Sequence, residues 1–188
     1  LRPFVRDVAR SALPLAPRHS TFWQLRRRRP LPLRLRSLRV VDSLRRLLDL
    51  WVEAYAQVLR PQLDPRRYRP LNVLALDWWK KATYRKLGAW LGGEGAGELV
   101  TRYLKPQDIT IYADDRAAFL KKHKLVVDPQ GPVTILDRFW RFEAKWEFPD
   151  VVPPVLIYAD LLATGDDRCR ETAEMVYDKY LAKTIAVD

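Results

Sequence analysis

The sequence is poor in the residues that bind metals and carry redox chemistry, with one cysteine and two histidines in 188 residues. Cys169 has no second cysteine with which to form an internal disulfide, and a multi-cysteine zinc site is excluded. Scarcity of cysteine is typical of proteins that work in a reducing compartment, so we expect a cytoplasmic protein. We expect neither a cofactor nor a bound metal.

Long apolar runs are also absent. The most apolar stretch, residues 151–164, contains Asp160 and two prolines, whereas a membrane-spanning helix needs roughly 18 to 20 apolar residues. Charged residues also interrupt the apolar residues near the N-terminus, which argues against a secretory signal. We therefore expect no association with a membrane.

Lysine is missing from the first 48 residues, where thirteen arginines face only Asp7 and Asp42. That excess accounts for the whole net charge of +11, because residues 49–188 contain 21 basic and 21 acidic side chains. Such a separation of charge is a boundary signal. It predicts a basic, arginine- and proline-rich segment at residues 1–46 and a main domain at residues 47–188.

The basic segment is a candidate for nucleic-acid binding, because guanidinium groups fit phosphate oxygens and release counterions from DNA. The candidate binding residues are Arg26, Arg27, Arg28, Arg29, Arg34 and Arg36. Pro30 and Pro32 argue against a continuous helix in this stretch. Two alternatives stay open: a disordered, self-repelling tail, and an out-of-frame translation of a GC-rich gene, which would give the same arginine, proline and leucine bias.

The first half of the main domain mixes helical and loop signals. Apolar residues recur every three or four positions over residues 43–59, which predicts a helix that ends before Pro61. Three prolines punctuate residues 62–71, which we interpret as an exposed basic loop. The aromatics of residues 71–91 are expected to face the core, and the glycine-rich turn at residues 92–97 to let a helix at residues 98–104 pack closely.

The second half predicts an α+β fold, a small mixed sheet packed with several helices, two of them at the C-terminus. Strands are expected at residues 109–112, 125–127 and 133–140, with the last two forming a hairpin. A helix at residues 116–123 should be capped by Asp114 or Asp115, with His123 interacting with the dipole at its end. Helices after Pro153 and after Asp166 or Asp167 close the chain.

The strongest catalytic candidates are Glu143 and Lys145, with Asp114, Asp115 or Asp137 as a second carboxylate. Two carboxylates and a lysine can hold a divalent metal and activate water, as in a nuclease of the PD-(D/E)xK type. A Glu-x-Lys pattern also arises by chance in a chain this rich in charge, and Glu143 and Lys145 can simply be the outward positions of an aromatic strand whose Phe142 and Trp146 point elsewhere. We therefore favour a non-enzymatic protein and keep the metal-dependent nuclease as the alternative.

Two further residues have unusual surroundings. Cys169 lies among acidic residues that should raise its pKa, which favours a small helix residue over a nucleophile. Asp160 lies among Leu156, Ile157 and Leu161, so its carboxylate must be paired or lie at a helix edge. A buried structural hydrogen bond is the simplest interpretation.

The sequence around Asp160 resembles the closing signature of the AbiEi family of antitoxins, transcriptional regulators of type IV toxin–antitoxin systems. The resemblance covers roughly residues 47–181. It is carried, in order, by residues 50–55, 59–61, 67–69, 92–94, 101–106, 109–112, 137–140 and 153–166.

The resemblance implies a regulator that binds operator DNA through an N-terminal winged helix and acts through this domain on an operon or a partner toxin. Residues 1–46 depart from that pattern, because their prolines leave little room for two consecutive helices. A degraded winged helix, leaving only an interaction domain, is therefore a further hypothesis. The partners expected are DNA and a cognate toxin protein.

Overall fold

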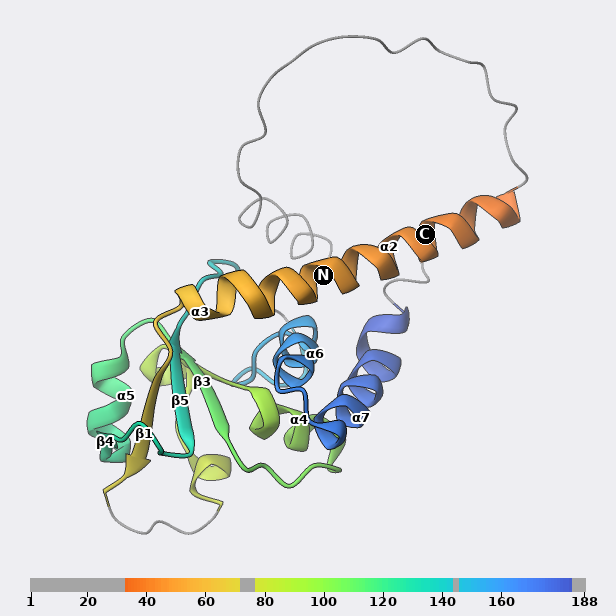
Figure 1. Ribbon diagram of the computed structural model, residues 1–188. Coiled ribbons are helices and arrows are strands. Elements are labelled where there is room, and N and C mark those ends of the chain that lie inside the picture. Colours follow the sequence, from red (N-terminus) through yellow and green to blue (C-terminus); the bar gives the residue numbers. More distant parts are fainter. Residues whose placement is uncertain (1–32, 72–76, 144–145, 184–188) are drawn as a thin grey trace, which may run out of the picture.

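A computed structural model describes residues 33–71, 77–143 and 146–183, with side chains described from Leu44 onward. Helices of different lengths and five strands follow one another along the chain (Figure 1). The α-helices are α2 (Leu33–Ala54), α3 (Arg60–Gln62), α4 (Gly93–Thr101), α5 (Arg116–His123), α6 (Pro154–Ala163) and α7 (Asp167–Val176). The π-helical turns are η1 (Tyr55–Leu59) and η4 (Tyr177–Leu181), and the 3₁₀ turns are η2 (Trp78–Lys81) and η3 (Arg85–Leu87).

The sheet has five strands in the order β2-β3-β5-β1-β4. They are β1 (Arg66–Pro70), β2 (Ala89–Gly92), β3 (Ile109–Ala113), β4 (Leu125–Val127) and β5 (Val133–Asp137). Only the β3–β5 pair among these strands is parallel, and the other three pairs are antiparallel. The mixed sheet, the packed helices and the two C-terminal helices α6 and α7 confirm the expected α+β class.

Strand β1 corrects two expectations, because residues 62–71 were interpreted as a loop and β4–β5 as a hairpin. β1 lies between β4 and β5, pairing Tyr68 with Val127 on one side and with Val133 on the other. Tyr68 is buried while the arginines on either side of it are exposed, so a single apolar position anchors the strand. Pro70 is tolerated because it is the last residue of the strand.

Helix α2 begins ten residues earlier than the periodicity predicted, at Leu33 rather than Ser43. Arg34 and Arg36 therefore lie within a helix, contrary to the expectation drawn from Pro30 and Pro32, because the helix starts directly after the second proline. The helical path also continues through η1 and α3. Pro61 is accommodated there because it occupies a first-turn position of α3, where no backbone N–H is needed.

Two other boundaries differ from expectation. β5 ends at Asp137, and the aromatic residues after it are irregular. α4 begins at Gly93, so the glycines expected to form a turn lie inside the helix. Gly97 packs against Thr172 and Leu161, where a Cβ atom would lie 3.2–3.3 Å from their side chains. The expected close packing is therefore present, but its partners are side chains.

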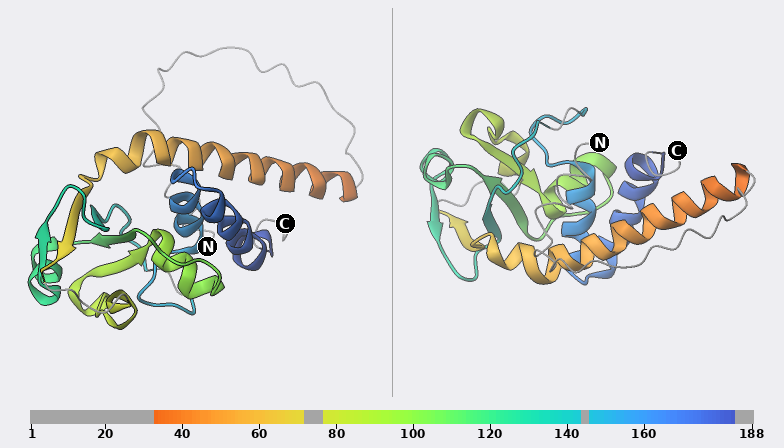
Figure 2. Two further views of the ribbon diagram at one scale, coloured as in Figure 1. Left: turned by 60° about the horizontal axis from the view of Figure 1, so that its bottom comes forward. Right: turned by 90° about the horizontal axis from the view of Figure 1, so that it is seen from above.

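Helices α4, α6 and α7 contact one another, and α2 runs across α6. Figures 1 and 2 show this group on one side of the molecule, whereas α5 and β4 lie at the opposite end of the sheet. α6 is apolar nearly all round, and every residue from Val151 to Leu161 is buried. A helix with that pattern belongs in the centre of a fold.

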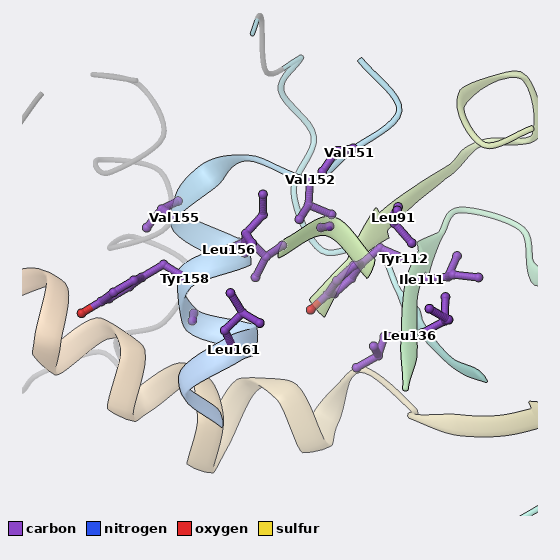
Figure 3. Close-up of a cluster of buried hydrophobic side chains, with 14 of the residues drawn as sticks. Leu91, Ile111, Tyr112, Leu136, Val151, Val152, Val155, Leu156, Tyr158 and Leu161 are labelled. Carbon is purple, nitrogen blue, oxygen red and sulfur yellow. The ribbon is translucent and has the colours of Figure 1, made fainter. Parts of the chain in front are cut away.

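The core joins the sheet to α6 (Figure 3). Leu91, Ile111 and Leu136 come from three adjacent strands, and Leu156 and Leu161 from α6. The segment before α6 also extends the sheet edge. The N–H of Leu91 donates to the carbonyl of Asp150 at 2.9 Å, and the N–H of Val152 donates to the carbonyl of Leu91 at 2.9 Å.

Candidate functional site

The sequence-predicted nucleic-acid residues lie at or beyond the edge of the described structure. Arg26, Arg27, Arg28 and Arg29 fall outside the described residues, and Arg34 and Arg36 belong to the first turns of α2. Figure 1 shows this part of α2 extending past α6 and α7. The role of these six arginines in nucleic-acid binding stays a prediction.

The catalytic candidates are not assembled in the part of the chain that is described. Glu143 lies on an irregular segment, its side chain is 72% exposed, and it pairs with Arg85 at 3.1 Å. The expected aromatic strand is therefore absent at Glu143, and Lys145 lies outside the described residues. The chain leaves β5 at Asp137, before the sheet can position Glu143.

The three upstream carboxylates are each engaged locally. Asp114 pairs with Arg138 at 3.1 Å and Asp137 with Arg116 at 2.7 Å. Asp115 accepts a hydrogen bond from the N–H of Ala117 at 2.8 Å, which confirms the expected cap of α5. Within the described residues, no group of three or more histidine, cysteine or acidic side chains is placed to hold a metal ion.

Asp160 is the most highly connected buried polar group, and the expectation that its carboxylate is paired is confirmed. The residue is 2% exposed and accepts hydrogen bonds from Tyr55 at 2.5 Å and from Tyr112 at 2.8 and 3.0 Å. The N–H of Gly93 donates to it at 3.1 Å, and Arg60 lies 3.5 Å away. Burial raises the pKa of Asp160, while these four partners oppose that rise.

Four separate segments therefore converge on one carboxylate. Tyr55 comes from η1, Arg60 from α3 and Tyr112 from β3, and Gly93 opens α4. The N-terminus of α4 also favours the negative charge through its dipole. Glycine is required here, since a Cβ atom on Gly92 would lie 2.7 Å from the Tyr112 ring. The Asp160 network thus ties the N-terminal helical segment to the sheet and to α4.

A polar pocket of about 330 Å³ adjoins this network. Thr110 on β3 and Thr134 on β5 are paired in register, so both side chains lie on the sheet face of Tyr112. The charged lining residues are Arg60, Arg67, Arg168, Glu94, Asp108, Asp160 and Asp166. Sequence reasoning did not find this pocket, because its residues come from seven helices and strands and from the loops between them.

The C-terminus of α5 carries three exposed lysines, Lys121, Lys122 and Lys124, and none forms an ion pair with any described residue. His123 between them packs against Phe119, with ring centroids 4.4 Å apart. Burial is the main cause of its lowered pKa, so the neutral form is favoured. This does not fit the expected role as a charged partner of the helix dipole.

Cys169 is buried near the start of α7, and burial is the first cause of its raised pKa. The raised pKa of Cys169 agrees with the expectation, although burial contributes more to the rise than the neighbouring acidic residues do. Asp166 caps the same helix, accepting from the N–H groups of Arg168 at 2.9 Å and Cys169 at 3.2 Å. Cys169 therefore behaves as a small core residue.

An exposed apolar stripe runs along α2 and η1. Leu47, Leu50 and Val58 are 42%, 56% and 57% exposed, and their spacing of three and eight residues places them on one helical face. A groove of about 270 Å³ lies beside the same helix, lined in part by Val52, Ala56 and Leu162. Asp49 and Glu53 also line the groove, so the apolar side chains are flanked by charge. Exposed apolar side chains that share one helical face are candidates for an interaction site.

A family model described as transcriptional regulator, AbiEi antitoxin, type IV TA (toxin–antitoxin) system, matches residues 39–182, more than half of the chain. The chain belongs to the AbiEi antitoxin family. No curated protein and no solved structure gives a significant match.

Membership in the AbiEi family confirms the resemblance found in the sequence and places the chain in a family of transcriptional regulators. The match contains the whole Asp160 network and begins inside α2, eight residues before the expected boundary at residue 47. It does not include Arg26–Arg29, Arg34 or Arg36, so family membership does not assign them a role. Within the described residues, no helix is long and apolar enough to cross a membrane.

Proposed function

We propose that this AbiEi-family chain is a DNA-associated antitoxin-type regulator whose arginine-rich segment binds phosphates while residues 47–188 act on an operon or a toxin. The observation that carries the proposal is the separation of charge in a chain of a regulator family. All of the net charge of +11 lies before residue 49, and the remaining residues are balanced. A balanced domain has little general attraction for DNA, whereas the arginine-rich segment has a strong one.

Helix α2 supports this proposal by joining the arginines to the folded body. Arg34, Arg36, Arg39, Arg45 and Arg46 lie along one helix that continues into η1 and the core. At a rise of about 1.5 Å per residue, the stretch from Arg34 to Arg46 spans about 18 Å. That length covers about five phosphates of one DNA strand.

The test is a salt titration of binding to duplex DNA by the full chain and by the variant Arg34→Gln/Arg36→Gln. Each phosphate contact contributes about 0.9 to the slope of log Kobs against log salt, so losing two contacts should reduce the slope by about 1.8. The matched control is Lys105→Gln/Arg141→Gln, which removes two exposed charges elsewhere.

Equal slopes for the two double variants would contradict a role for α2 in binding DNA. A slope that stays steep in both would direct attention to the lysines at the end of α5, which lie on the folded body.

A second activity, neutralisation of a toxin protein, is favoured by the apolar stripe on α2 and η1. Leu50 and Val58 are more than half exposed, and a partner that covers them gains the free energy of burying their side chains. We expect Leu50→Ser/Val58→Ser to lose neutralisation of a co-expressed partner toxin. Val127→Ser is the control, because Val127 is 72% exposed on β4, away from α2. Full neutralisation by the double variant would overturn this assignment.

A further inference from the structure

The pocket beside the Asp160 network is lined by two largely buried threonines whose hydroxyl groups are open to the pocket. Thr110 and Thr134 are 5% and 8% exposed, both line the pocket, and neither side chain has a hydrogen-bond partner in the described part of the chain. A hydroxyl group can both donate and accept a hydrogen bond, so these two are available to whatever occupies the pocket. These two therefore face a space that holds water or a polar guest.

The charged residues around this pocket indicate which kind of ligand it can bind. Each of the three arginines is already paired with its own aspartate: Arg60 with Asp160 at 3.5 Å, Arg67 with Asp108 at 2.5 Å, and Arg168 with Asp166 at 3.3 Å. Glu94 is left over. It is 8% exposed and forms no ion pair with a described lysine or arginine, and its carboxylate accepts one hydrogen bond, from the N–H of Gln107 at 2.8 Å.

Glu94 is thus a largely buried carboxylate with one hydrogen bond and no ion pair, although the charge of Arg168, which lines the same pocket, acts to lower its pKa. We propose that this pocket binds a cationic nitrogen group, a guanidinium or a primary ammonium, with Glu94 as its counter-ion. The hydroxyls of Thr110 and Thr134 accept hydrogen bonds from the same group. All three side chains line one cavity, and both cations present several N–H donors to such acceptors.

An anion does not fit the same space. The first N–H of α4, that of Gly93, already donates to Asp160, and Glu94 in the first turn repels a second negative charge. Burial also raises the pKa of Glu94, and a bound cation would oppose that rise. Cation binding and ionisation of Glu94 therefore favour each other.

The volume of about 330 Å³ is at the small end of ligand pockets and suits a small molecule or a single side chain of a protein. Both sources present the same nitrogen chemistry. The proposal is independent of DNA binding, because none of the pocket residues belongs to the arginine-rich segment.

The test is an NMR titration of the full chain, following the backbone amides of Gly93, Gln107 and Thr110. The probes are arginine, lysine and citrulline, each blocked at both backbone ends, so that citrulline supplies an uncharged group of nearly the same shape as arginine. We expect saturable shifts with arginine or lysine and none with citrulline. Equal binding of citrulline, or no saturable shift with any probe, would overturn the proposal and leave a pocket that holds only water.

Glu94→Gln tests the counter-ion while keeping an acceptor for Gln107. Loss of one charge-assisted interaction should weaken cation binding by about tenfold or more. The matched control is Glu98→Gln on the same helix, whose side chain pairs with Lys80. Unchanged affinity in Glu94→Gln would contradict the assignment.

Thr110→Val/Thr134→Val provides an independent test if Glu94→Gln fails to fold, because it leaves the charge in place. We expect severalfold weaker binding, and unchanged affinity would remove the hydroxyls from the site. Agmatine and a short peptide with one central arginine distinguish the sources. Tighter binding of agmatine assigns the site to a small molecule, and tighter binding of the peptide assigns it to a protein side chain.

Discussion

Replacing Asp160 by asparagine removes the charge at the centre of the network and nearly preserves the side-chain volume. The amide cannot accept from Tyr55, Tyr112 and Gly93 on both of its polar atoms, and Arg60 loses its only described carboxylate partner. Removing one member of a buried ion pair costs about 3–5 kcal/mol. Because the Arg60 side chain is 31% exposed and retains some hydration, we expect about 2–4 kcal/mol.

Urea unfolding followed by tryptophan fluorescence measures this change, and the matched control is Asp167→Asn. Asp167 is 92% exposed and pairs with Arg170 on the surface, so its substitution should change the free energy of unfolding by less than about 0.5 kcal/mol. At about 2–4 °C per kcal/mol, Asp160→Asn should lower Tm by roughly 4–16 °C. A change as small as that of the control would refute the structural role of the network.

Three other predictions follow from single residues. Gly93 has φ +54°, and a Cβ atom there would lie 2.6 Å from the Thr110 hydroxyl oxygen, so Gly93→Ala should cost about 1–3 kcal/mol in urea unfolding; an unchanged midpoint would contradict it. The lowered pKa of His123 means that the unfolded chain binds a proton more readily, so stability should fall as the pH drops below about 6.5. His123→Gln should flatten that fall, and identical pH profiles of unfolding would refute the explanation. Glu143 is exposed and paired with Arg85, so DNA incubated with Mg²⁺ and the chain should stay intact; cleavage that is lost in Glu143→Ala would instead establish the nuclease alternative.

The features predicted correctly from the sequence are those set by neighbouring residues. The caps Asp115 and Asp166 precede their helices by one position, and the prolines before α6 mark its start. The sequence of α6 also lies within residues 153–166, one of the segments that carried the resemblance to the family. The need for a partner at Asp160 followed from its apolar neighbours alone.

The features missed depend on residues far apart in the chain. Tyr68 makes β1 a strand by pairing with residues about 60 positions later, and the local prolines gave the opposite signal. The partners of Asp160 were equally hidden, since Tyr55 is 105 residues away and Tyr112 is 48. Tyr112 alternates with Ile109 and Ile111 in a strand that is buried throughout, so periodicity alone could not assign its hydroxyl to Asp160.

The central claim is that the arginine-rich segment binds nucleic acid, and the salt dependence of DNA binding tests it most directly. The comparison is between the full chain and a variant with Arg26, Arg27, Arg28 and Arg29 all replaced by glutamine. We expect a steep salt dependence for the full chain and a slope reduced by about 3.6 in the variant, for four lost phosphate contacts. The same slope and affinity in both proteins would contradict the claim and direct the search to a protein partner of the α2 stripe.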